Sequence, residues 1–340
     1  MRLAFFAQES SAIKTAIIEH FPQYRYRQLM QWVYSRKIYD PSLMTNLPKD
    51  FIQWILDNYS FSLPQIDQER SAGDGSTKYR LVLQDSSKIE MVLIPDKEHK
   101  KLTLCVSSQV GCARACNFCA TGRMGLIRNL AIHEIVGQIM LAATLSKDKR
   151  LTNIVFMGMG EPMDNLDSVL KAISLIQEED TLAFSPRRIT ISTCGIPAGI
   201  AQLADSGIKA KLAVSLNSAL DEVRNTLMPV NRKYSLAALK HAINYYLKRS
   251  SFRVTFEYIL IPDLNMDSSA IKALQSFVGD LSCKINFIPY NPVPGLPYRA
   301  PEEAEIEAFM AIASSLNQAI TLRRSRGAEV NGACGQLAAN

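Results

Sequence analysis

The sequence of 340 residues predicts an α/β fold, in which a partial (β/α)6 barrel follows a small N-terminal helical domain and a β-hairpin connector. Three observations predict it. From residue 101 onward, six β-rich runs alternate with helical segments, which is typical of a parallel sheet with right-handed crossovers. Residues 9–58 contain short helical patterns separated by prolines. Between these regions lie two β-like runs joined by a turn.

The composition is that of a globular protein, with 47% hydrophobic and 21% charged residues and no repeat of fixed period. No apolar run approaches the ~20 residues of a membrane span, and the first apolar stretch is too short for a secretory signal. Seven cysteines do not form a disulfide framework in a chain this long. We therefore expect a cytoplasmic protein with no membrane contact.

The net charge of +6 is compatible with binding to nucleic acid but does not by itself indicate such binding.

Residues 1–60 are expected to form the helical domain, with helices over 12–20, 25–35 and 49–58. Basic and aromatic side chains alternate in its middle. They are Tyr24, Arg25, Tyr26, Arg27, Trp32 and Tyr34. Such residues can bind RNA through phosphate pairing and base stacking, but aromatic residues at helical spacing more often belong to a core. Both interpretations stay open at this point.

Residues 61–100 are expected to form a linker and a β-hairpin, with strands over 78–83 and 88–94. The barrel is expected over 101–325. Its predicted strands are 102–107, 152–157, 188–193, 210–216, 253–260 and 284–289, with 319–323 as an additional candidate. Its predicted helices lie near 131–146, 166–178, 198–206, 235–249, 267–280 and 302–317.

Unusual residues follow the ends of these strands. They lie in the segments 112–119, 158–162, 192–195, 215–218 and 290–292. Active sites of parallel barrels gather at the carboxyl ends of the strands. The sequence therefore predicts one site at one mouth of the barrel.

Three cysteines, Cys112, Cys116 and Cys119, stand at a C-x₃-C-x₂-C spacing. Thiolates are the ligands that iron–sulfur clusters take, and a four-iron cube held by three of them keeps one iron open for a substrate. Two other interpretations are open for these cysteines. Structural zinc, with Cys105 as a fourth ligand, usually shows two separated Cys or His pairs. Cysteines buried only as packing residues are common, but three so close together are not expected by chance.

Five segments resemble the RlmN/Cfr family of radical S-adenosylmethionine (SAM) RNA methyl synthases, and the resemblance covers most of the chain. They are Ile89-Glu-Met-Val-Leu-Ile-Pro95, Cys105-Val-Ser-Ser-Gln-Val-Gly-Cys112, Cys119-Ala-Thr-Gly122, Phe156-Met-Gly-Met-Gly-Glu-Pro162 and Ala333-Cys-Gly-Gln-Leu337. Their order and joint presence make the match specific. The resemblance implies a partial barrel of the radical SAM type.

The same resemblance implies the cofactors and their ligands. A [4Fe–4S] cluster is expected on Cys112, Cys116 and Cys119. The SAM contacts are expected from Gly160, Glu161, Ser192, Ser215, Leu216, Asn217 and Asn291. Two positions depart from the family pattern: Asn217 stands where the family usually has His, and Cys194 stands where Ser is common.

Cys334 resembles the family's methyl-accepting cysteine, which carries an S-methylcysteine intermediate; two SAM molecules are then used per turnover. Residues 326–340 around it, rich in glycine near Cys334, are expected to be mobile. Cys105 matches the resolving cysteine, which forms a transient disulfide with Cys334. Glu90 matches the family's proton acceptor, although a solvated strand face would also explain a Glu there.

The resemblance implies methylation of carbon 2 of an adenosine in 23S ribosomal RNA, near the peptidyl transferase centre. Family precedent also allows transfer RNA, at the adenosine next to the anticodon. Two alternatives remain: Cfr-type methylation at carbon 8, and a non-enzymatic RNA-binding protein with structural zinc. The intact segment from Ile89 to Pro95 favours carbon 2 over carbon 8. The expected partners include an electron donor such as flavodoxin, and the expected state is a monomer.

Overall fold

A computed structural model describes residues 2–96, 100–146 and 149–339 of the chain. Its centre is one sheet of ten strands in the order β14-β13-β12-β11-β10-β9-β6-β5-β4-β3. The seven strands from β14 to β6 pair in parallel and carry the barrel. They are β6 (Lys101–Cys105), β9 (Arg150–Phe156), β10 (Ile189–Thr193), β11 (Lys211–Ser215), β12 (Val254–Leu260), β13 (Cys283–Pro289) and β14 (Ala319–Leu322). The predicted fold class is confirmed, and the additional strand candidate is β14.

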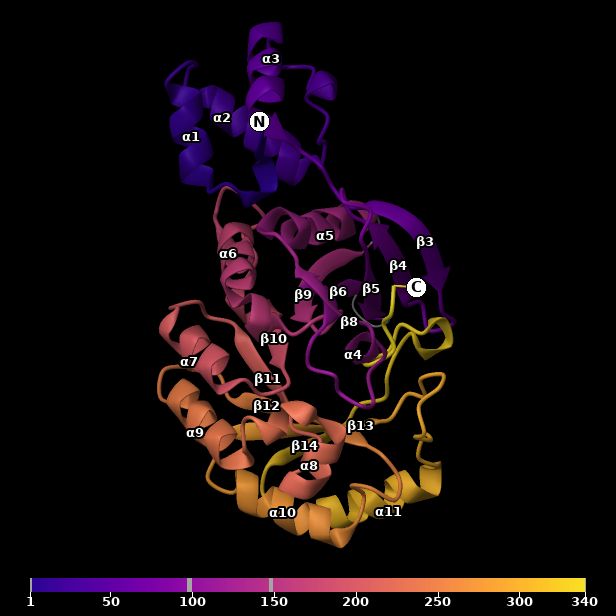
Figure 1. Cartoon of the computed structure of the whole chain (residues 1–340). Helices are drawn as coiled ribbons and strands as arrows, with labels where there is room; N and C mark the ends of the chain where they lie inside the picture. The colour runs from indigo at the N-terminus through magenta and orange to yellow at the C-terminus, as the bar shows by residue number, and fades with distance from the viewer. Residues whose placement is uncertain (1, 97–99, 147–148, 340) are drawn as a thin grey trace.

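Helices cover the outer face of the parallel strands (Figure 1). They are α5 (Ile132–Leu145), α6 (Leu166–Gln177), α7 (Pro197–Asp205), α9 (Leu236–Leu247), α10 (Ser268–Val278) and α11 (Glu303–Ala313). Helix α8 (Asp221–Leu227) instead lies at the carboxyl ends of the strands, where its Arg224 contacts the carbonyls of Cys194 and Leu216. Local signals fix where several begin. Asp267 caps α10 by accepting the amide of Ala270 at 2.7 Å, and Glu134 accepts the amide of Ala131 at 2.8 Å in the first turn of α5. No helix was predicted from the sequence at α8.

The connector extends the same sheet with antiparallel strands β3 (Gln65–Ser71), β4 (Thr77–Val82) and β5 (Lys88–Asp96), and β5 pairs with β6. The hairpin of β4 and β5 agrees with the two predicted runs. Strand β3 was not predicted. It is the edge strand, and six of its seven residues are exposed. Because neither of its faces is buried, its sequence lacks the alternation of apolar and polar residues that identifies a strand.

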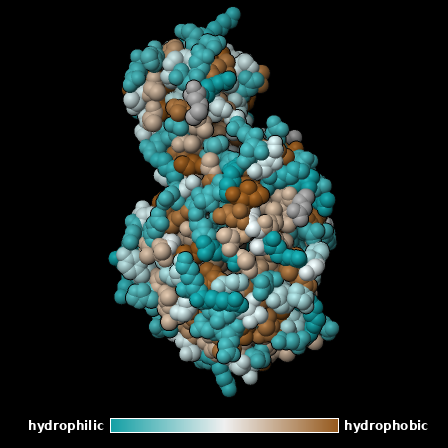
Figure 2. All heavy atoms as spheres, in the orientation of Figure 1, coloured by the Kyte–Doolittle hydropathy of each residue, from teal (hydrophilic) through white to brown (hydrophobic). Residues whose placement is uncertain are grey.

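The N-terminal helices form a smaller lobe at one end of the molecule (Figures 1 and 2). They are α1 (Ser10–Ile18), α2 (Tyr24–Met30), which continues into a π-helical turn at Gln31–Ser35, and α3 (Lys49–Asn58). The short strands β1 (Leu3–Ala4) and β2 (Tyr59–Ser60) pair beside them. Figure 2 shows that the visible surface of this lobe is largely hydrophilic.

Most aromatic residues of this lobe belong to its core. Tyr26, Trp32 and Tyr34 are buried, and the Tyr26 hydroxyl donates to Asp180 at 2.8 Å, which ties the lobe to the barrel. Only Tyr24, 53% exposed beside Arg25, keeps the surface position that base stacking needs. In the part of the chain that the structure describes, no helix is long and apolar enough to cross a membrane.

Candidate active site

The cysteine loop leaves the sheet through a small hairpin formed by β7 (Gln109–Cys112) and β8 (Gly125–Asn129). Gly111 is required there: its φ is +77°, and a Cβ at this position would lie 1.9 Å from the carbonyl oxygen of Gly125. Cys119 then precedes the short helix α4 (Ala120–Arg123), and its amide donates to Cys116 at 3.1 Å. The loop therefore begins at Cys112, at the end of β7, and forms a tight turn between Cys116 and Cys119.

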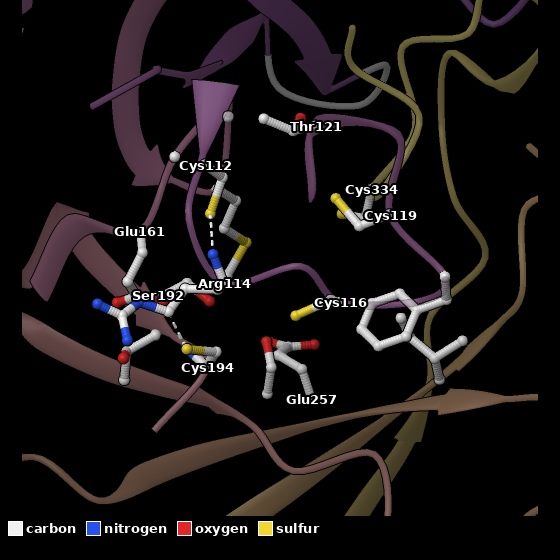
Figure 3. A pocket seen from close by; sticks show the side chains of 18 of the residues that line it. Cys112, Arg114, Cys116, Cys119, Thr121, Glu161, Ser192, Cys194, Glu257 and Cys334 are labelled. Carbon is white, nitrogen blue, oxygen red and sulfur yellow. Dashed lines mark hydrogen bonds between the residues drawn. The ribbon is translucent and has the colours of Figure 1, made fainter. Parts of the chain in front are cut away.

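All three thiols line one cavity at the mouth of the barrel (Figure 3). Its volume is about 150 Å³. Five parallel strands, β9 to β13, and the residues that follow them also line it, through Gly158, Gly160, Glu161, Ser192, Thr193, Cys194, Ser215, Asn217, Glu257, Ile259 and Ile288. Burial raises the pKa of the free Cys112 thiol to about 12, and it raises the pKa of Cys116 and Cys119 as well.

The segment Gly158–Glu161 is packed against the start of the cysteine segment. A Cβ on Gly158 would lie 2.7 Å from the Val106 backbone, and one on Gly160 would lie 2.6 Å from Gln109. These glycines thus permit close packing of two loops. For Gly160 this role is additional to the SAM contact predicted from the sequence. The Glu161 carboxylate is 4% exposed. It accepts amides of Met163 and Cys194 at 3.0 and 2.7 Å, while burial raises its pKa.

Asn217 has a φ of +59°, a conformation that Asn adopts more readily than most residues. Its side-chain oxygen accepts the amide of Ile259 at 3.0 Å, and its amide group contacts the Met228 sulfur at 3.2 Å. The side chain therefore holds β11 to β12. Leu216 beside it is fully buried. Asn291 does not line this cavity; its amide donates to Ser325 at 2.8 Å and to the Cys334 carbonyl at 3.4 Å.

The C-terminal segment lies across the mouth of the barrel. The amide of Ala120 donates to the Gly335 carbonyl at 2.7 Å, and the Thr121 hydroxyl donates to the Leu337 carbonyl at 2.6 Å. Both donors follow Cys119 directly in the chain. As a result, Cys334 lines the cavity that the three loop cysteines share.

Cys334 also lines a second cavity of about 590 Å³, together with Cys105 at the end of β6. Arg323 lines both cavities. Burial raises the pKa of Cys105 to about 12, and the nearby Cys334 raises it further. Burial also raises the pKa of Cys334, whereas the charge of Arg323 acts in the opposite direction. Both thiols are free, and each is buried or half-buried.

Glu90 lies on β5 and is 3% exposed, so the solvated strand face considered above is wrong for this residue. It forms an ion pair with Lys78 at 3.0 Å. Its other carboxylate oxygen accepts the amide of Ala338 at 3.0 Å. The proton acceptor predicted from the sequence is therefore in direct contact with the C-terminal segment.

The chain is similar to several known proteins. Residues 106–272 match the family model of the radical SAM superfamily. The chain is 41% identical to the dual-specificity RNA methyltransferase RlmN of Bdellovibrio bacteriovorus, over 93% of this chain and 78% of that relative. It is 42% identical to a probable RlmN of Dictyoglomus thermophilum, over 94% of this chain and 91% of the relative.

The chain belongs to the RlmN family of RNA methyltransferases. Its structure is similar to that of a radical SAM methyltransferase from Sphaerobacter thermophilus, with a TM-score of 0.94 and 36% identity over 99% of this chain and 100% of that one. The protein is thus a SAM-dependent enzyme that acts on RNA. Family membership overturns the alternative of a non-enzymatic RNA-binding protein with structural zinc.

A [4Fe–4S] cluster and SAM are the cofactors of this family, and the residues present fit both. A cube needs thiolates that each bind a different iron, so its cysteines must face one cavity rather than converge on a point. Cys112, Cys116 and Cys119 do face one cavity (Figure 3). Among the described residues, no three ligating side chains meet at a position for a single metal ion. The Glu257 carboxylate, which lines the same cavity, keeps one buried oxygen without a hydrogen-bond partner, as a site for a polar ligand requires.

Arg224 on α8 is a residue of this site that sequence reasoning missed. It is fully buried, and its guanidinium donates to the carbonyls of Cys194 at 2.6 Å and Leu216 at 3.1 Å, as well as to the Asn231 side chain at 2.7 Å. It thus joins the ends of β10 and β11, which carry four of the predicted SAM contacts. An arginine in a short helix gives no sequence signal for such a role.

Replacing Arg224 with methionine is expected to lower the free energy of unfolding by about 3 kcal/mol, because it leaves several buried acceptors without a donor. Denaturant unfolding measures this value. The control is Arg249→Met, which removes an exposed ion pair with Asp205 at 3.1 Å and is expected to cost about 0.5 kcal/mol. Equal stabilities of the two variants would contradict the structural role of Arg224.

Proposed function

We propose that the protein methylates carbon 2 of an adenosine in 23S ribosomal RNA and, in addition, an adenosine of transfer RNA. The observation that carries the proposal is the common cavity of Cys334 and the three loop cysteines. It brings a nucleophilic thiol to the place where the family binds its cluster and SAM. Resemblance of the segment Ile89–Pro95 to the carbon-2 branch supports this position over carbon 8.

When bound, the cluster and SAM supply the electron, the radical chemistry and the methyl group, with two SAM molecules used per turnover. Cys112, Cys116 and Cys119 hold the cluster. Gly160, Glu161, Ser192, Ser215, Leu216, Asn217 and Asn291 are proposed to hold or frame SAM. For Asn291 this requires a change in its present bond to the C-terminal segment.

The residues of the chain then perform four tasks. Cys334 accepts the methyl group on its sulfur, forming a C–S bond as the methyl leaves SAM and the thiol proton is lost. The same sulfur carries the carbon to the adenine ring, since an electron-poor ring carbon cannot attack SAM itself. Glu90 takes the proton from that ring carbon. Cys105 forms a disulfide with Cys334 as the bond between Cys334 and the RNA product breaks.

An electron donor of the flavodoxin kind is proposed to feed the cluster, and an external reductant restores the two thiols after each turnover. The protein is proposed to work as a monomer in the cytoplasm, where ribosomal and transfer RNA are its substrates.

Nucleoside mass spectrometry of RNA from cells with and without the protein tests this function. We expect 2-methyladenosine in ribosomal and transfer RNA to depend on the protein. Appearance of 8-methyladenosine in its place would assign the carbon-8 activity, and no change in either nucleoside would contradict the proposal.

A further inference from the structure

Lys78 on β4 is a buried cation that neither the sequence motifs nor the proposed mechanism uses. Its ammonium group lies 3.0 Å from Oε1 of Glu90 on the neighbouring strand. The two side chains are 9% and 4% exposed. Removing one partner of a buried ion pair is costly because the other charge stays buried without compensation. The pair therefore fixes the position of the Glu90 carboxylate.

The second oxygen of Glu90 is also in use. Oε2 accepts the amide of Ala338 at 3.0 Å. Lys78, Glu90 and Ala338 together line a cavity of about 580 Å³, on whose wall Arg70 and Arg123 add positive charge. The cavity therefore lies next to the carboxylate and has the charge that a phosphate-bearing RNA chain requires.

A carboxylate that takes a proton must come within about 2.6–3.2 Å of the atom that gives it. Lys78 holds Oε1 of Glu90, which leaves Oε2 as the oxygen that the ion pair does not use. Oε2 accepts the Ala338 amide. Because Glu90 lines neither of the two cavities that Cys334 lines, an adenine carried by Cys334 needs the Ala338 amide to move aside before it reaches this oxygen.

We propose that Lys78 is a positioning residue for Glu90: it holds Oε1 and directs Oε2 at a position that the Ala338 amide fills until the target adenine displaces it. This inference rests on the proposed function, because it assumes Glu90 as the proton acceptor. It adds a positioning residue and a segment of the protein, Ala338 and its neighbours, that competes with the RNA.

Two sets of variants test it. In the first, Lys78→Met removes the charge, Lys78→Arg keeps it, and Lys88→Met is the control, since it removes an exposed partner of Asp67 from the strand that carries Glu90. In the protein without RNA, hydrogen exchange of the Ala338 amide is expected to be about tenfold faster in Lys78→Met, because the Glu90 carboxylate that accepts this amide is no longer held in place by its ion pair. Lys78→Arg and Lys88→Met are expected to exchange like the parent.

During turnover with reconstituted enzyme and an RNA substrate, Lys78→Met is expected to accumulate a covalent RNA adduct on Cys334, because proton removal is slowed after the carbon has been attached. Lys78→Arg is expected to clear the adduct. A general loss of structure would lower adduct formation instead of raising it. Parent-like exchange together with parent-like adduct levels in Lys78→Met would overturn the role of Lys78.

The second set keeps the ion pair intact and so does not depend on whether Lys78→Met folds. A chain that ends at Leu337 lacks the Ala338 amide, and a chain that ends at Ala339 is its control. The first is expected to lower KM for RNA about fivefold with little change in kcat, as the loss of one competing hydrogen bond predicts. An unchanged or raised KM would refute the competition. If Cys105→Ala also traps no RNA, the proposed function is wrong. If Cys105→Ala traps RNA but Lys78→Met and the chain ending at Leu337 behave like the parent, only the role of Lys78 and Ala338 is wrong.

Discussion

Cys105→Ala is expected to convert the enzyme into a covalent RNA–protein adduct, whereas Cys334→Ala is expected to form no adduct and to carry no methyl group. Both sulfurs line the same cavity of about 590 Å³, and no other cysteine lines it among the described residues. Without Cys105, this second cavity holds no other thiol that could form the disulfide that releases Cys334 from the product. Denaturing electrophoresis of the reaction mixture and mass spectrometry of the C-terminal peptide measure the two outcomes.

The control for this pair is Cys283→Ala. Cys283 is a buried cysteine at the start of β13, the end of the strand opposite to the site, and it lines neither cavity. This variant is expected to methylate RNA and to release it. If Cys105→Ala turned over freely, the assignment of Cys105 as the resolving cysteine would be wrong.

The parallel strands were predictable because their signal is local. Each of these strands is an apolar run bounded by turn residues, and the chemically unusual segments follow their carboxyl ends. Strand β3 gave no such signal, because an exposed edge strand such as Gln65–Ser71 needs no buried face. The cysteine loop was predictable because cluster binding requires a particular spacing of the three cysteines, and this requirement does not depend on packing.

The contacts that organise the site were less accessible from the sequence. Arg224 acts through carbonyl groups of distant strand ends, and Lys78 acts through a residue on the next strand. Neither position differs in sequence from a solvated charge. Asn291 was predicted as a SAM contact, but in the structure it binds the Cys334 carbonyl, which only the path of the C-terminal segment reveals. The mobility predicted for residues 326–340 stays a prediction.

Alanine in place of Cys112, Cys116 or Cys119 is expected to abolish iron binding. The parent protein should carry about four irons per chain after anaerobic reconstitution and should be brown. Each of the three thiols faces the cavity from a different point of one loop, so the loss of any one leaves a cube with too few protein ligands. Iron analysis and the visible absorption spectrum measure the effect without any RNA substrate.

Cys194→Ala gives this experiment its sharpest control. Cys194 lines the same cavity and is buried like the loop cysteines, but it lies at the end of β10, and its backbone amide binds Glu161. Because it stands outside the C-x₃-C-x₂-C loop, we expect this variant to keep about four irons. Loss of iron from Cys194→Ala, with retention in Cys112→Ala, would show that the cavity binds its cluster through a different set of thiolates.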